Sequence, residues 1–475
     1  MQSHLPVYDL LRDAAQKWPE NPAVHDAKGS ITFTELFSQT ETLRKKLTDL
    51  GVKPGMGLGL KARNGRNFIM GLFAGVGCGA TVMPVSQQLK KQELEDLLAE
   101  ACLHVLIDDG SGVPAQLTVT SMIEMETGSF SLAYTGNGQT LPYAPIVDQP
   151  AFIRFTSGTT GKSKGVVVSH QSMIERIDGA NNALCLVWVL PMAYHFIVSV
   201  VLYVRFGAAI AVAEDFLAKN IIEITNRHQC TLLYASPMQI RLLSNDKGAD
   251  MMPSLKHVIS TSASISPDVC LAFQHRFGIP VSQAYGIIEI GLPMINYNKS
   301  AEHPEAVGYA LPGYTVDILD DDHNPLPPGK TGHLAIKGPG MFDAYLLPAT
   351  PRDEVLKNGY FLTADYASKS ADGLVTIEGR AKSVINVSGL KVFPEEVEAV
   401  LELLPEIKMA RISSSPHPLM GQVIEGEIVL HEGKSIDVED VLTYCRKRLS
   451  SFKAPQRLRI VDSLPVTGSG KVRRY

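Results

Sequence analysis

A segment rich in glycine, hydroxyl groups and lysine is the part of this sequence best suited to chemistry. Residues 156–165 read TSGTTGKSKG, and they lie between two short apolar runs, 151–153 and 166–168, that predict strands. Glycines let a backbone approach a ligand closely, and successive N–H groups, hydroxyls and lysines are suited to phosphate oxygens. The segment therefore predicts a phosphate-binding loop.

The spacing of this loop excludes one well-known class of phosphate binder. A P-loop nucleoside triphosphatase has four residues between its first glycine and the Gly-Lys pair. Here only two residues separate Gly158 from Gly161. The loop must therefore bind its ligand in another structural setting.

The elements around the loop predict an α/β fold. Short apolar strands alternate with helical segments over most of the first 300 residues, which favours a mostly parallel sheet covered on both faces. A helix is expected to begin after Thr34, which we expect to be its cap, with Glu35 following it. Around residue 300 the pattern changes to antiparallel strands, 314–319 and 332–337, which predict a small β unit. The last 95 or so residues predict a small α+β domain, with helices at 394–404 and 438–449.

One stretch is free of charge and long enough to suggest a membrane span. Residues 184–204 contain no Asp, Glu, Lys or Arg. Pro191 and His195 lie inside it, however, and a strand, a turn and a buried helix would have the same composition. We expect a buried core segment and no transmembrane helix.

Composition narrows the class of protein. The chain has 475 residues, which at roughly 100–200 residues per domain predicts two to four folded units. Hydrophobic residues make up 45% and the formal net charge is −5, so a globular protein is expected and a surface built for nucleic acid is not. The N-terminus shows no signal-peptide pattern and the six cysteines form no CxxC pair. These features predict a cytoplasmic protein.

Taken together, the motifs resemble those of the adenylate-forming superfamily, which includes acyl- and aryl-CoA synthetases, nonribosomal peptide adenylation domains and beetle luciferases. The phosphate loop is the first match. The others follow in the expected order: YGIIE (285–289), GHLAIKGPG (332–340), YFLTAD (360–365), GRAKSVINVSG (379–389), PEEVE (394–398) and PVTGSGK (465–471). One such motif is weak evidence, but this many in register cover most of the chain.

The resemblance implies a two-step reaction that uses ATP and Mg²⁺. A carboxylate attacks the α-phosphate of ATP and forms an acyl-adenylate and pyrophosphate, and a thiol then accepts the acyl group. The thiol is that of CoA or of phosphopantetheine on an acyl carrier protein. The resemblance also implies an N-terminal AMP-binding domain, residues 1–380, made of parallel-sheet αβαβα-type subdomains and a small β-barrel. It further implies a mobile C-terminal lid, residues 381–475, that rotates about Lys382.

The matching motifs imply a role for each of these residues. The catalytic group is Lys471, His195 and Glu289, where Lys471 contacts the reacting carboxylate and α-phosphate. Thr156 and Glu289 would hold Mg²⁺, and Gly389 would approach the thiol tunnel. Binding of ATP and AMP is expected from Thr156, Ser157, Gly158, Thr159, Thr160, Gly161, Lys164, Ser262, Ala263, Tyr285, Gly286, Asp365, Ile377 and Arg380. The acid pocket is expected from Tyr194, His195, Phe196, Val200, Ser236, Ser260, Gly286 and Gly291.

The sequence also departs from the family pattern. Ser163 stands where the phosphate loop has proline, and Ile288 stands where the family has a threonine in YGxTE. Amino-acid-activating members carry an aspartate where this chain has Phe196, and an apolar wall cannot pair with a buried ammonium group. We therefore expect an active enzyme whose substrate is a fatty or aromatic acid without an α-amino group.

Two alternatives remain open from the sequence. One is an acyl-AMP ligase that loads only an acyl carrier protein. The other is a nucleotide-binding pseudoenzyme, against which the presence of Lys471 argues.

Overall fold

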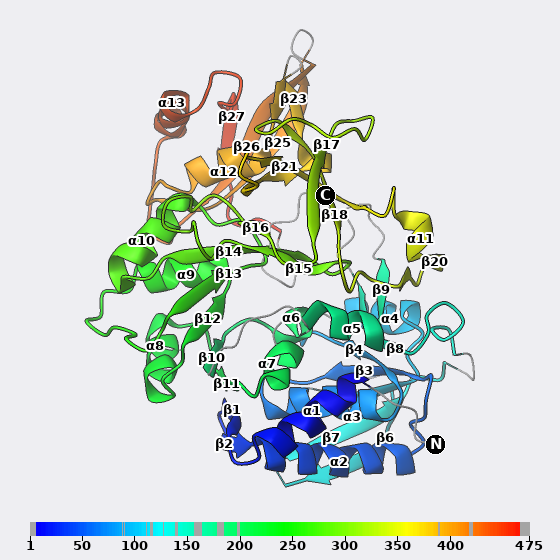
Figure 1. Cartoon of the computed structure of the whole chain (residues 1–475). Helices are drawn as coiled ribbons and strands as arrows, with labels where there is room; N and C mark the ends of the chain where they lie inside the picture. The colour runs from blue at the N-terminus through cyan, green and yellow to red at the C-terminus, as the bar shows by residue number, and fades with distance from the viewer. Residues whose placement is uncertain are drawn as a thin grey trace.

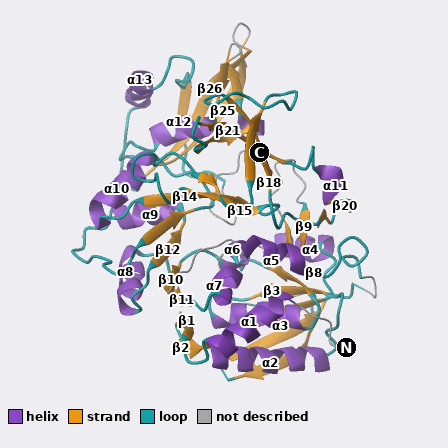
Figure 2. Ribbon diagram, in the orientation of Figure 1, coloured by secondary structure: helices purple, strands orange, loops and turns teal. Residues whose placement is uncertain are grey.

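The computed structural model describes most of the chain as two large sheets, a smaller sheet and a C-terminal domain (Figure 1; Figure 2). The described residues are 6–87, 89, 91–110, 112–114, 117–126, 128–137, 141–155, 164–177, 185–196, 200–387, 390–417 and 421–465.

The first large sheet has a parallel centre. From edge to edge, its strands within the described residues are β16 (Tyr309–Ala310), β15 (Gly291–Ile295), β14 (Val281–Ile287), β13 (His257–Ser260), β12 (Leu232–Ala235), β10 (Cys185–Trp188), β11 (Ala209–Val212), β1 (Pro22–Asp26) and β2 (Gly29–Thr32). The strands from β14 to β1 pair in parallel, and β16, β15 and β2 are antiparallel at the two edges. Their carboxyl ends consequently meet at one edge of the sheet.

The second large sheet contains the two strands that flank the phosphate-loop segment in the sequence. Its strand order in the described part is β20 (Thr350–Pro351), β19 (Ala344–Tyr345), β9 (Gly165–Ser169), β8 (Pro150–Phe155), β4 (Thr81–Pro84), β3 (Gly57–Lys61), β5 (Val105–Asp108), β7 (Gly128–Tyr134) and β6 (Val119–Met125). β8, β4, β3 and β5 are parallel, whereas β9 is antiparallel to β8. The predicted loop therefore connects two paired strands of this sheet.

Helices cover the large sheets because their strands are apolar on both faces. Between the two sheets lie α1 (Pro6–Lys17), α3 (Arg66–Gly77) and α5 (His170–Ile177), which share one buried core with both. On the outer face of the first sheet pack α8 (Ala218–Arg227), α9 (Pro237–Ser244) and α10 (Pro267–Phe277), and α4 (Lys91–Glu100) packs on the outer face of the second. This arrangement confirms the predicted α/β class.

The small β unit is an antiparallel sheet. In the described residues its order is β17 (Thr315–Leu319), β18 (Thr331–Lys337), β21 (Phe361–Lys369) and β22 (Val375–Arg380). The short helix α11 (Arg352–Val355) lies between β20 and β21 in the chain.

The C-terminal segment has a core of its own. It contains β23 (Ile385–Val387), β24 (Leu390–Val392), β25 (Ile407–His417), β26 (Gly421–Leu430) and β27 (Arg457–Ile460), with the helices α12 (Pro394–Leu401) and α13 (Val438–Arg448). These elements are orange to red at the top of Figure 1. The segment has the predicted α+β fold.

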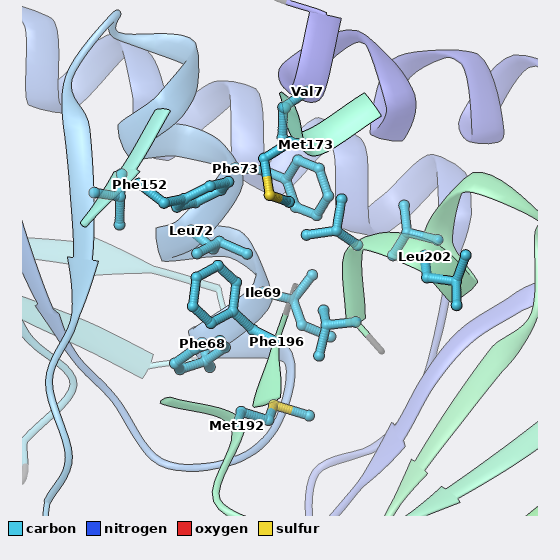
Figure 3. Close-up of a cluster of buried hydrophobic side chains, with 14 of the residues drawn as sticks. Val7, Phe68, Ile69, Leu72, Phe73, Phe152, Met173, Met192, Phe196 and Leu202 are labelled. Carbon is cyan, nitrogen blue, oxygen red and sulfur yellow. The ribbon is translucent and has the colours of Figure 1, made fainter. Parts of the chain in front are cut away.

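The uncharged stretch forms several short elements in place of one long helix. β10 is followed by a turn at Pro191, by α6 (Met192–His195) and, after three residues outside the described part, by a segment ending in α7 (Leu202–Arg205). Figure 3 shows Phe196 from this stretch packed beside Phe68 and near Phe152 in the core. No helix among the described residues is long and apolar enough to cross a membrane.

The predicted helix cap is displaced by two residues. α2 (Phe33–Asp49) is capped by Thr32, whose hydroxyl accepts from the Glu35 backbone N–H at 3.2 Å. The Glu35 carboxylate in turn accepts from the Thr32 backbone N–H at 2.8 Å. Thr34 was the wrong choice because a capping box needs Glu three residues after the cap.

A stacked histidine pair predicts acid sensitivity of the fold. His25 on β1 stacks on His228 with ring centroids 3.9 Å apart, and its Nδ1 lies 2.6 Å from Ser30 Oγ. Burial, and then His228, lower the pKa of His25 to about 4, although Asp26 opposes this. Burial and then Arg227 lower the pKa of His228 as well. The unfolded chain, with a histidine pKa of about 6.5, thus binds the proton more readily than the folded chain.

We expect stability to fall as the pH drops from about 6.5 toward 4, by about 1–2 kcal/mol through His25 after allowance for its partial solvent screening. His25→Gln should remove this part of the pH dependence. Urea denaturation at pH 7 and pH 5 would measure it in both proteins. Equal losses in wild type and variant would contradict the role of His25.

Candidate active site

Most of the predicted acid and nucleotide residues follow the carboxyl ends of neighbouring parallel strands. His195 lies beyond β10, Ser236 follows β12, Ser260 ends β13, and Tyr285 lies in the last part of β14. The phosphate loop follows β8 of the other sheet. Ligands of open α/β sheets bind outside the carboxyl ends of strands, so this edge is the candidate site.

One cluster joins the first sheet to the small β sheet. The Tyr285 hydroxyl donates to Asp365 Oδ2 at 2.5 Å, and Arg380 Nε lies 2.8 Å from Asp365 Oδ1. Asp365 and Arg380 face each other across β21 and β22, and the Asp365 residue is only 3% exposed. Burial and the Asp365 carboxylate raise the pKa of Tyr285 well above its usual value, so the phenol stays protonated and donates. The cluster brings three predicted nucleotide residues together, with an aromatic ring beside a carboxylate acceptor.

A second cluster surrounds Glu289. Tyr345 on β19 donates its hydroxyl to Glu289 Oε1 at 3.1 Å, and Lys164 Nζ lies 4.6 Å from the centre of the Tyr345 ring. Arg176 on α5 donates to the Glu289 carbonyl at 3.3 Å and to the Gly340 carbonyl. Burial raises the pKa of Glu289, while Tyr345, Arg176 and Arg380 oppose that rise.

The residues of this second cluster fit Mg²⁺ bound together with phosphate. Magnesium is commonly held by one or two carboxylates plus substrate phosphates. Glu289 supplies one half-buried carboxylate, and Tyr345, which donates to it, lies under the cation Lys164. Among the described residues no group of three His, Cys, Asp or Glu could hold a metal by itself. A metal here would therefore depend on oxygen atoms from a bound nucleotide.

The residues near His195 form a third group. His195 Nε2 lies 3.1 Å from Ser262 Oγ, which links the segment after β10 to the loop after β13. Ser262 has a backbone φ of +79°, rare for a residue other than glycine. The hydroxyl of Ser260 is buried and has no hydrogen-bond partner among the described residues. A buried hydroxyl without a partner at a strand end is suited to a ligand.

Several predicted pocket residues have other contacts. Phe196 and Val200 are fully buried in the core because the uncharged stretch packs between the sheets. The Ser236 hydroxyl donates to Gln239 Oε1 at 2.9 Å at the start of α9. A Cβ on Gly286 would lie 2.7 Å from the Gly291 carbonyl, and Gly291 has a φ of +97°, so both glycines are required by the turn between β14 and β15.

Other predicted residues are peripheral or outside the described part. Ala263 is exposed. Ile377 lies in β22, opposite Ala367 of β21, and is half-buried. Lys382 lies in a single 3₁₀ turn, Ala381–Ser383, between β22 and β23. The structure does not describe Thr156, Ser157, Gly158, Thr159, Thr160, Gly161, Gly389 or Lys471, and their roles stay predictions.

The C-terminal segment contacts the rest of the chain beside the site. Lys391 Nζ donates to the Tyr366 hydroxyl at 2.9 Å and lies 3.8 Å from Asp321. Arg241 on α9 forms an ion pair with Glu402 just after α12 at 3.1 Å. These polar contacts are partly exposed, and the Phe393 ring of the C-terminal segment also packs on Tyr366, with ring centroids 5.8 Å apart.

Sequence reasoning missed three site residues. Arg176 and Tyr345 support Glu289, but neither belongs to a recognised motif. Arg154 lies on β8 directly before the loop, and a single charge inside an apolar strand was the signal that could have revealed it. The Ser236–Gln239 spacing could likewise have identified the helix start.

Comparisons with known proteins agree with the motifs. Residues 11–346 match the family described as AMP-binding enzyme, and residues 396–471 match its C-terminal domain. The chain is 26% identical over 492 residues to sulfoacetate–CoA ligase of Cupriavidus necator, covering 98% of this chain and 96% of the relative. It is 28% identical over 499 residues to oxalate–CoA ligase of Arabidopsis thaliana, with the same coverage.

A solved structure shares the fold over nearly the whole length. It is o-succinylbenzoate CoA synthetase from Bacillus subtilis in complex with an acyl-adenylate intermediate, with a TM-score of 0.83 and 21% identity over 98% of this chain and 96% of that one. The family match confirms the resemblance found in the sequence. The chain belongs to the AMP-binding enzyme family, within the adenylate-forming superfamily.

Proposed function

We propose that this chain is an AMP-forming acid–CoA ligase. An oxygen of the substrate carboxylate would form a bond to the α-phosphorus of ATP as the bond to pyrophosphate breaks. The CoA sulfur would then form a thioester with the acyl carbon, AMP would leave, and the thiol proton would pass to solvent. The relatives named as CoA ligases and the family match support this reaction.

The observation that carries the proposal is the pair of clusters at the strand ends. Tyr285, Asp365 and Arg380 offer an aromatic face, a carboxylate and a cation, which suit adenine, the ribose hydroxyls and a phosphate. Lys164, Tyr345 and Glu289 offer a cation and a carboxylate, which suit the outer phosphates and Mg²⁺. Bound Mg²⁺ would neutralise phosphate charge. Positioning and charge stabilisation are the main contributions a protein makes to transfer at phosphorus.

The remaining roles rest on the sequence. Lys471 would approach the α-phosphate and the reacting carboxylate, and rotation of the lid about Lys382 would exchange it for the Gly389 loop. The two partly exposed contacts made by Lys391 and Arg241 would have to break in such a rotation.

The acid itself lacks an α-amino group in this proposal. No Asp or Glu stands in residues 184–204, so that segment offers no partner for an ammonium group. The relatives named for sulfoacetate and oxalate act on acids with a second anionic group, which adds that class to the fatty and aromatic acids expected from the sequence.

The test is product analysis with purified protein, ATP, Mg²⁺ and a panel of acids. We expect AMP, pyrophosphate and an acyl-CoA, each in equal amount, by mass spectrometry. A holo-acyl carrier protein in place of CoA tests the alternative acceptor. Formation of ADP and phosphate with the acyl-CoA would overturn an AMP-forming mechanism.

The hydroxyl of Tyr345 offers a graded test of the metal site. Tyr345→Phe keeps the ring under Lys164 and removes only the hydrogen bond to Glu289. We expect the Mg²⁺ concentration at half-maximal activity to rise about 10-fold, because groups that orient a metal ligand typically change affinity by that order. Tyr309→Phe removes a comparable hydroxyl bond, to Asp372 on the surface, and should leave the Mg²⁺ dependence unchanged. An unchanged Mg²⁺ dependence in Tyr345→Phe would contradict this role of Glu289.

A further inference from the structure

Arg154 is a cation beside the predicted acid pocket that none of the roles above uses. It lies on β8, two residues after Phe152, so its side chain is on the strand face that points toward Phe196 and the first sheet. The neighbours on the opposite face, Ile153 and Phe155, belong to the outer core with α4. The arginine therefore faces the space between the two sheets.

Its contacts anchor it to the pocket segment. The Arg154 guanidinium donates to the Tyr194 backbone carbonyl, and the guanidinium carbon Cζ lies 5.0 Å from the centre of the Tyr194 ring. Burial lowers the pKa of Arg154 to about 10, while Tyr194 and Glu289 oppose that change. The side chain is therefore partly desolvated and still charged at neutral pH, and the residue as a whole is half-buried.

Two other buried cations of this chain have a carboxylate partner, whereas the buried Arg176 donates to the backbone carbonyls of Gly340 and Glu289. Arg66 pairs with Asp26 at 2.7 Å, and Lys61 pairs with Asp108 at 3.3 Å. No carboxylate among the described residues lies within ion-pair distance of Arg154, and one backbone carbonyl is its hydrogen-bond acceptor there. A guanidinium has five N–H donors, so most of this one can still bind an anion. Leaving such a charge desolvated and unpaired is costly.

We propose that Arg154 binds a second acidic group, a carboxylate or sulfonate, at the end of the substrate acid away from the reacting carboxylate. This inference rests on the proposed function, and it narrows the acid to a short or aromatic acid with two anionic groups. The hydrogen bond to the Tyr194 carbonyl places the guanidinium at the predicted acid-pocket segment, whereas Lys164 lies over the ring of Tyr345, the residue that donates to Glu289. A planar guanidinium can bind a carboxylate through two parallel hydrogen bonds.

The proposal predicts strong discrimination by charge. A site built to bind a polar group rejects an analogue that lacks it by large factors, because its own polar groups are left unpaired. We expect wild-type kcat/KM to be at least about 100-fold higher for a diacid than for its monomethyl ester, which keeps the chain and the reacting carboxylate.

The test compares wild type, Arg154→Met and Arg154→Lys in acid-dependent pyrophosphate release. The acids are dicarboxylic acids of two to six carbons, benzene dicarboxylic acids and sulfoacetate, each beside an analogue without the second charge. Arg154→Met should lose about 100-fold in kcat/KM for the preferred diacid, little for the neutral analogue, and nothing in the KM for ATP. Arg154→Lys should recover part of the loss. Arg227→Met, which alters an exposed arginine on α8, should match wild type.

Other results would overturn the proposal. One is that wild type prefers monoacids and Arg154→Met keeps that preference. Another is that Arg154→Met loses the same factor in kcat/KM for every acid and has a raised KM for ATP, which would assign Arg154 to the phosphates. Thermal shift with each diacid alone separates this question from turnover. A rise in melting temperature in wild type but not in Arg154→Met would support the subsite even if no acid is turned over, in which case only the proposed function fails. Neither a shift nor turnover with any diacid would overturn the subsite.

Discussion

Replacing Glu289 with glutamine should lower kcat/KM for adenylate formation by about 100- to 1000-fold, the scale seen when one charge-stabilising group is removed from an active site. The substitution keeps the size of the side chain and an acceptor for Tyr345, and it removes the negative charge that would bind Mg²⁺. ATP–pyrophosphate exchange over a range of Mg²⁺ concentrations measures the effect. Excess Mg²⁺ should not restore the rate.

The pH dependence gives the same variant a second readout. Burial raises the pKa of Glu289, so its carboxylate takes up a proton at a higher pH than an ordinary glutamate does. Protonation competes with Mg²⁺ for this carboxylate, so at limiting Mg²⁺ activity should fall on acidification as the pH approaches that raised pKa, and Glu289→Gln should lose this limb of the profile. Glu223→Gln, on the exposed face of α8, should behave as wild type. A loss in Glu289→Gln of less than about 5-fold would contradict a metal-binding role.

The second large effect concerns Lys471. Lys471→Ala should reduce adenylate formation by about 1000-fold. The reaction brings a carboxylate close to the anionic α-phosphate, and the substitution removes the positive charge that we propose stabilises both groups. Thiolysis of a chemically prepared acyl-adenylate by CoA should change by less than about 5-fold, since that step does not need the lysine at the phosphate.

A matched lysine serves as the control for this experiment. Lys447 lies on α13 in the same C-terminal segment, and Lys447→Ala should leave the rates of both half-reactions unchanged. Equal losses of adenylate formation and thiolysis in Lys471→Ala would argue for a structural role of the lysine and against the proposed division of labour.

The sequence was sufficient to predict the fold class and the family because both depend on features that repeat along the chain. Alternating apolar strands and helices predict covered parallel sheets, and ordered motifs identify the superfamily. The nucleotide cluster was also accessible, since Tyr285, Asp365 and Arg380 belong to three motifs, and the structure brings their side chains within hydrogen-bond distance.

The composition of the acid pocket was harder to predict. An uncharged stretch lines a pocket or fills a core equally well, and packing decided that Phe196 and Val200 lie in the core. Arg154 was missed for a related reason. The pattern of a strand predicts which face a residue occupies. It does not predict that, in the described part of the chain, no carboxylate lies within ion-pair distance of Arg154, because that depends on how the two sheets pack together.

Acid-dependent exchange of labelled pyrophosphate into ATP tests the central claim most directly, because it reports adenylate formation without any thiol acceptor. The account predicts exchange that requires both Mg²⁺ and an acid, with diacids or sulfonated acids ahead of their neutral analogues, and that disappears in Glu289→Gln. Thioester formation from CoA and ATP in the complete absence of such exchange would contradict it.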